Sequence, residues 1–63
     1  MTQKELLYLE DAYKHEDNII CMCNLTLEML EDEELISFLE KEIKKHTSFK
    51  EKLLSFMEEK ANE

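Results

Sequence analysis

The sequence predicts an all-α protein, an antiparallel helical hairpin dimerising into a four-helix bundle. The chain of 63 residues contains no glycine and no proline, and it is rich in leucine, glutamate, lysine and methionine, which favour helix. Its apolar residues recur at alternating steps of three and four, the spacing of one helical face. A chain this short buries only about 60% of its unfolded surface alone, so we treat residues 1–63 as a single helical-hairpin domain that is stabilised by oligomerisation.

The first helix is expected at about residues 3–30. Thr2 and Glu5 have the spacing of a capping box, in which both side chains satisfy free amide groups at a helix start. A main stripe follows one side of this helix: Leu6, Leu9, Tyr13, Glu16, Ile20, Cys23, Leu27 and Leu30. A second stripe lies about 100° further round: Tyr8, Ala12, His15, Ile19, Met22, Thr26 and Met29.

The turn is expected at about residues 31–33 and the second helix at about 33–60. Asp32 can cap that helix, and the neighbouring carboxylates favour its positive end. The predicted main stripe of this helix is Leu35, Leu39, Glu42, His46, Phe49, Leu53 and Phe56. A neighbouring stripe of Ile36, Ile43, Leu54 and Met57 is interrupted by Thr47 and Lys50.

A break in the second helix is the competing interpretation. Ser48 and Glu51 also have capping-box spacing, so the helix could end near Thr47 and give a three-helix chain. The apolar phase passes through this segment without a slip, which favours one continuous helix.

Two stripes on each helix predict self-association. A lone hairpin covers one face of each helix, whereas a four-helix bundle gives every helix two neighbours. We therefore expect a homodimer, with a further protein partner as an additional possibility. The expected interface residues are Leu6, Leu9, Tyr13, Ile20, Cys23, Leu27, Leu30, Leu35, Leu39, Phe49, Leu53 and Phe56.

Three polar residues interrupt the main stripes and are the candidate functional residues. Glu16 and His46 are expected within about one helical turn of each other, and Glu42 precedes His46 by one turn. Two-fold doubling would supply four carboxylates and two imidazoles, the ligand set of a di-iron or di-manganese site in a helical bundle. Ferritin-like sites, however, space the glutamate and histidine by three residues, and here the spacing is four.

The favoured interpretation is therefore that Glu16 and His46 form an ion pair or hydrogen bond that fixes hairpin register. On this interpretation the protein has no cofactor. A carboxylate and histidine site for iron, manganese or zinc is the alternative.

Charge and composition argue against several other functions. Sixteen acidic residues against eight lysines give a net charge of −8, which repels nucleic acid and anionic membrane surfaces. Cys21 and Cys23 are only two residues apart, so a disulfide between them would close no useful loop. We expect both as reduced thiols. No segment resembles a signal peptide or membrane span, so we expect a cytoplasmic location. No group of residues forms a catalytic constellation, and we expect no enzymatic activity.

Two family resemblances agree with this expectation. The order Glu28, then Leu35, Leu39 and Ile43, then Leu53-Leu54-Ser55-Phe56-Met57 resembles the ferritin-like hairpins of spore coat protein F-like proteins. The aromatic, glycine-containing tail often seen in that family is missing here. The segment 34–45, ELISFLEKEIKK, is similar to the second helix of small sporulation-inhibitor hairpins that bind histidine kinases. Both resemblances imply a sporulation-related helical hairpin that works through protein contacts.

Overall fold

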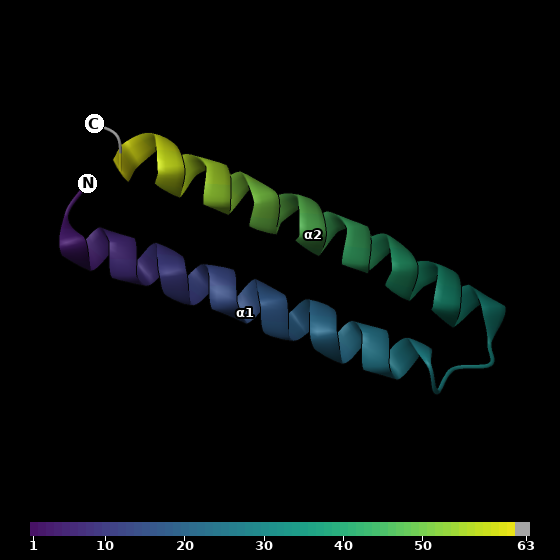
Figure 1. Ribbon diagram of the computed structural model, residues 1–63. Coiled ribbons are helices and arrows are strands. Elements are labelled where there is room, and N and C mark those ends of the chain that lie inside the picture. The colour runs from purple at the N-terminus through teal and green to yellow at the C-terminus, as the bar shows by residue number, and fades with distance from the viewer. Residues whose placement is uncertain (62–63) are drawn as a thin grey trace.

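The computed structural model describes residues 1–61 and shows a helical hairpin. Helix α1 spans Gln3–Leu27 and helix α2 spans Glu33–Ala61. The two helices run antiparallel, side by side along nearly their whole length, and the start of α1 and the end of α2 lie opposite the turn (Figure 1). The result is a rod of 47 × 15 × 11 Å. The predicted all-α hairpin is confirmed.

Helix α1 begins as the capping box predicts. The amide of Glu5 donates to the Thr2 hydroxyl at 3.0 Å, and the amide of Thr2 donates to the Glu5 carboxylate at 2.8 Å. These hydrogen bonds favour the ionised carboxylate, so the pKa of Glu5 is lowered, the backbone bond with Thr2 being the main cause. Two amides that helix formation leaves without partners are thereby satisfied.

Helix α1 ends at Leu27, earlier than the expected boundary near residue 30. The amides of Met29 and Leu30 donate to the carbonyls of Thr26 and Leu27, at 2.9 and 3.3 Å, in bonds that tighten the chain into a turn. The following residues are carboxylates from Glu31 to Glu34, and no basic residue occupies the last turn of α1. Negative charge is unfavourable at a helix C-terminus, which explains why the connection occupies 28–32 and not 31–33.

Asp32 caps α2, as predicted. Its Oδ1 accepts hydrogen bonds from the amides of Glu34 and Leu35, at 2.9 and 3.2 Å. Beyond this cap the helix continues through Thr47 and Ser48 without interruption. The three-helix alternative is therefore not what the structure shows.

The interface between the helices uses the predicted main stripe of α1. Since α2 is the only other helix within residues 1–61, half-buried residues of α1 mark the side that faces it. They are Leu6, Leu9, Ala12, Tyr13, Glu16, Ile20, Cys23 and Leu27, and Leu30 follows in the turn. Burial is shallow throughout, and among the described residues Met57 alone is classed as buried, at 9% exposure.

The phase of α2 differs from the prediction. Leu35, Phe49 and Phe56 of the predicted main stripe do not face α1 in the single hairpin, where all three are exposed, with Phe49 at 48%. The residues that face α1 are instead Ile36, Leu39, Glu42, Ile43, His46, Thr47, Lys50, Leu53, Met57 and Lys60.

The facing side is offset by one residue at three positions, since Ile36, Lys50 and Met57 lie where Leu35, Phe49 and Phe56 were predicted. The sequence placed Phe49 in the main stripe and Lys50 as an interruption of the neighbouring stripe. In the structure the Lys50 stem crosses the interface and its ammonium group reaches polar and aromatic partners on α1. A lysine with such partners can occupy an interface position, and the phenylalanines then turn to the surface.

The hairpin exposes more surface than a compact protein of its mass. Its accessible area is 5261 Å² for 7.6 kDa, against about 4300 Å² expected for a compact folded monomer of that size. No helix within residues 1–61 has the length and apolar character to cross a membrane.

Candidate functional site

Glu16 of α1 and His46 of α2 form a polar cross-link at the middle of the hairpin. Nδ1 of His46 lies 2.5 Å from Oε2 of Glu16, and the side chains are 31% and 14% exposed. Because an ionised carboxylate can only accept a hydrogen bond, the imidazole donates from Nδ1. The contact predicted from the two positions in sequence is present, and it joins residues 30 apart in the chain.

Glu42, the third predicted ligand, does not join this pair. Its Oε1 accepts a hydrogen bond from Nζ of Lys45, one turn further along α2, at 3.3 Å. No group of three histidine, cysteine, aspartate or glutamate side chains within residues 1–61 is arranged to hold a metal ion. A single hairpin thus brings together two of the three predicted ligands, and those two are bonded to each other.

The cysteines lie apart from this cross-link. Cys21 is exposed and Cys23 is half-buried in the hairpin interface, and both are free thiols. Residues two apart on a helix point about 200° away from each other, so their sulfur atoms do not converge.

A second cross-link, which the sequence analysis missed, lies one turn along α2 from His46. Lys50 pairs with Asp17 of α1, and its ammonium group lies 5.2 Å from the centroid of the Tyr13 ring. The hydrogen bond with Asp17 is the main reason why the pKa of Lys50 is raised. The sequence contained a signal for this contact. The antiparallel alignment that places Glu16 beside His46 also brings Lys50 near Tyr13 and Asp17.

Exposed apolar side chains gather on one side of the hairpin. They lie on positions that alternate by three and four from Met1 to Met29, and again from Leu35 to Glu59. We call these two series the second face. Apart from Met1, each of these positions comes one residue before a position of the hairpin interface. In an antiparallel pair of helices, such positions fall on the same side of both helices. The exposed large apolar residues of the second face are Met1, Tyr8, Ile19, Met22, Met29, Leu35, Phe38, Phe49 and Phe56.

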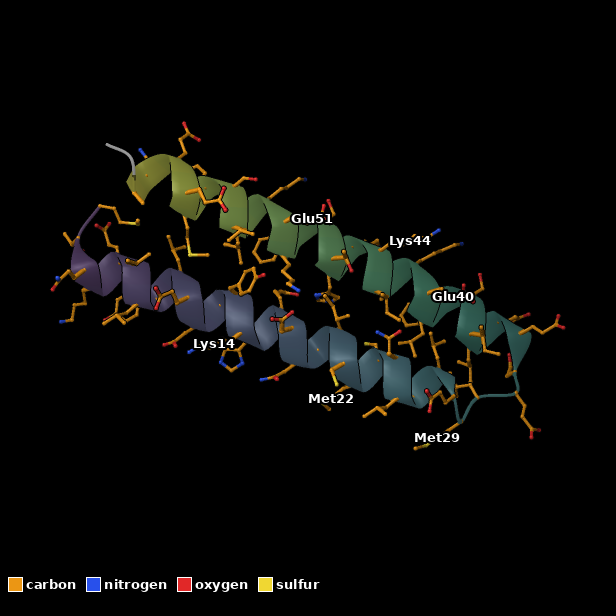
Figure 2. The ribbon with its side chains drawn as sticks, in the orientation of Figure 1. Lys14, Met22, Met29, Glu40, Lys44 and Glu51 are labelled. Atoms are coloured by element: carbon orange, nitrogen blue, oxygen red, sulfur yellow. The ribbon has the colours of Figure 1, made fainter. Side chains whose placement is uncertain are left out.

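Contacts at the open end support this assignment. Met1 and Tyr8 of the first series and Phe56 of the second line one groove, together with Glu5. Further along α1, the side chains of Met22 and Met29 both point away from α2 (Figure 2).

The second face is apolar and nearly neutral. It holds nine of the twelve large apolar side chains that the described residues expose, the other three being Leu7, Leu25 and Leu54. Its charged residues are Glu5, Glu42, Glu59, Lys45 and Lys52, a balance of −1, whereas the whole chain carries −8. Charge is concentrated on the remaining surface, where the labelled side chains of Lys14, Glu40, Lys44 and Glu51 project outward (Figure 2).

No family model, curated protein or solved structure matches this chain.

Proposed function

We propose that this protein is a non-enzymatic assembly module, a helical hairpin that dimerises through its second face into a four-helix bundle. The observation that carries the proposal is the gathering of nine exposed large apolar side chains on that one face. Apolar patches of such extent on small proteins mark interaction sites.

The direction of the second face and the accessible area of the hairpin both agree with a four-helix bundle. In a four-helix bundle each helix contacts two neighbours about a quarter-turn apart. The second face lies about 100° round each helix from the hairpin interface. The excess of the accessible area of 5261 Å² over the compact value of about 4300 Å² is of the order that a stable interface buries on each partner.

Charge also favours a second copy as the occupant. A chain with a net charge of −8 repels itself on average. The second face carries a balance of only −1, so two copies can approach there with little repulsion. The resemblance to spore coat and sporulation-inhibitor hairpins extends the proposal to a sporulation-related assembly within the cell.

The test is sedimentation equilibrium of the whole chain at micromolar concentration, comparing two matched variants. Met22→Glu places a carboxylate on the second face, where the native side chain is 66% exposed. Leu25→Glu makes the same change in the same helix at a residue that is 53% exposed but lies off that face. We expect dimeric wild type and Leu25→Glu and monomeric Met22→Glu. A folded, monomeric wild type would refute the proposal.

Ferritin-like metal binding is a second candidate function, and the contact between Glu16 and His46 favours it, because it brings two potential ligands together. The donor set of a single hairpin does not complete a site, so further ligands would have to come from a second copy. Titration with Fe²⁺, Mn²⁺ and Zn²⁺, followed by calorimetry on wild type and Glu16→Gln, tests this candidate. Stoichiometric binding that is lost in Glu16→Gln would support it, and no binding would exclude it.

A further inference from the structure

We infer that the second copy packs on the second face with its long axis reversed, so that the two turns lie at opposite ends of the bundle. This inference rests on the proposed dimerisation and specifies its geometry. Two hairpins stacked face to face about a two-fold axis have two possible arrangements. The axis either runs along the rod, which places the two turns together, or crosses it, which reverses one hairpin.

The height of each residue along the rod, which we call its level, determines which residues meet in each arrangement. The cross-links between Glu16 and His46 and between Tyr13 and Lys50 show that residues of α1 and α2 are level when their numbers sum to about 63. Apart from Met1, which precedes α1, the second face extends from residue 5 to 29 and from residue 35 to 59. Full overlap of two faces therefore centres the two-fold axis at the level of residues 17 and 47.

With the turns together, α1 of one copy packs on α2 of the other, and like charges meet. Residues at equal levels then face each other, so Glu5 lies opposite the partner subunit's Glu59, and symmetry repeats this repulsion. The apolar side chains of Ile19 and Met22 are placed against the partner subunit's Lys45 and Glu42. Apolar side chains also meet here, since Tyr8 lies opposite the partner subunit's Phe56, so the like charges of Glu5 and Glu59 are what disfavours this arrangement.

With one hairpin reversed, each helix packs antiparallel on its own copy, and opposite charges meet. Because the axis crosses α2 at residue 47, a residue of α2 meets the residue of the partner's α2 for which the two numbers sum to about 94. Glu42 lies opposite the partner subunit's Lys52, and Phe38 lies opposite the partner subunit's Phe56. On α1, Ala12 lies opposite the partner subunit's Met22, a small residue against a large one. Glu5 and Glu59 now lie opposite the partner subunit's Met29 and Leu35, so two pairs of opposite charge replace two pairs of like charge.

Spin labels in the turn distinguish the arrangements. We would introduce Glu31→Cys in a background with Cys21→Ser and Cys23→Ala, attach a nitroxide, and measure distances by double electron–electron resonance. Reversed hairpins separate the two labels by about 40 Å, the length of α2 at 1.5 Å per residue. Hairpins with their turns together bring the labels to about 20 Å, since packed helix axes are only about 10 Å apart.

Each result of this experiment has one meaning. A separation of about 40 Å supports the inference. A short separation in a dimer overturns the reversed arrangement and leaves dimerisation intact. Absence of a dipolar signal together with a monomeric mass overturns dimerisation itself, provided that circular dichroism shows the background variant to be helical and unlabelled wild type is monomeric too.

Charge reversal gives an independent test with a matched control. In the reversed dimer, Lys52→Glu places a carboxylate opposite the partner subunit's Glu42 at two symmetric sites, and we expect the dimer dissociation constant to rise about 3- to 30-fold, as for exposed pairs. Lys44→Glu makes the same charge change on the outer side of α2, where Figure 2 shows the lysine projecting away from α1, and should change the constant less than about twofold.

A coupled variant completes the test. The effect of Lys52→Glu should shrink when Glu42→Gln removes the opposing carboxylate. With the turns together, Lys52 would lie opposite the partner subunit's Ala12. An unchanged dissociation constant in Lys52→Glu would therefore overturn the reversed arrangement.

Discussion

The imidazole of His46 and the carboxylate of Glu16 meet at 2.5 Å across the middle of the hairpin, joining two helices that otherwise contact mainly through apolar side chains. Both groups are only partly exposed, so they lose part of their hydration when the pair forms. The charge-assisted hydrogen bond between them offsets this loss. A paired polar contact of this kind opposes sliding of one helix along the other, because a shift by one turn leaves both groups without a partner.

We expect Glu16→Gln and His46→Gln each to lower the free energy of unfolding by about 1.5 kcal/mol, the lower end for a hydrogen bond to a charged group, because both side chains are partly exposed. Thermal unfolding followed by circular dichroism measures this loss. The double variant Glu16→Leu with His46→Leu should be at least as stable as wild type, because apolar replacement of a buried pair is often neutral or stabilising. A double variant less stable than either single variant would contradict this account.

Removing one aromatic side chain from the second face should weaken the dimer with little effect on the hairpin. Full burial of a phenylalanine contributes about 1.5–3 kcal/mol, and dimerisation can bury only the 48% of Phe49 that the hairpin exposes. The two-fold axis doubles this loss, so Phe49→Ala should raise the dissociation constant at least about 10-fold. Leu54→Ala is the control, since Leu54 is similarly exposed, at 41%, but lies off that face. Equal effects of the two substitutions on sedimentation would argue against the second face as the interface.

The cross-link of Lys50 with Asp17 predicts a dependence on alkaline pH. The pKa of Lys50 in the folded chain is raised above the ordinary value of 10.5, chiefly by its hydrogen bond to Asp17. Its contribution to stability is therefore fully present below pH 10.5 and is lost as the pH rises through the higher pKa. Wild type should lose more thermal stability above pH 10.5 than Lys50→Gln does, and Lys44→Gln should behave like wild type.

The capping box predicts the opposite dependence at acid pH. The pKa of Glu5 is lowered below 4.5, so its contribution is present above that pH and is lost as the pH falls through the lower pKa. Glutamine can make the same capping hydrogen bond without titrating. The difference in melting temperature between wild type and Glu5→Gln should therefore shrink below pH 4.5, and an unchanged difference would contradict the role of the ionised carboxylate.

Removal of the cap itself should fray the start of α1. Thr2→Ala deletes the hydroxyl that accepts from the Glu5 amide and should cost about 1 kcal/mol. Faster amide hydrogen exchange confined to the first turn of α1 is the expected readout. Thr26→Ala is a suitable comparison, because the Thr26 hydroxyl donates to a carbonyl within the helix and caps no free amide.

Local signals explain what the sequence predicted well. The caps at Thr2 and Asp32 depend on residues three or fewer apart, and the structure contains both. The main stripe of α1 is equally clear, because Leu6 to Leu30 keep one phase over the whole helix. The contact between Glu16 and His46 followed from those elements by geometry alone.

The phase of α2 was not predictable from local pattern. Hydrophobicity ranks Phe49 above Lys50 as an interface residue, yet Lys50 faces α1 because Tyr13 and Asp17 receive its ammonium group. That preference depends on a partner helix more than thirty residues earlier in the chain. The α1 half of the second face was predicted as the second stripe of that helix, whereas its α2 half becomes visible only when Phe49 and Phe56 are placed on the surface.

The start of α1 and the end of α2 lie at one pole of the rod, where Met1 and Thr2 line a groove together with Ala61. A peptide or domain joined to either end would therefore emerge from the same pole. In the reversed dimer, two such attachments would project from opposite poles, separated by nearly the 47 Å length of the rod. The dimer would then act as a rigid spacer that presents two binding groups in opposite directions. Such an arrangement favours linking two separate targets over bivalent binding to a single target.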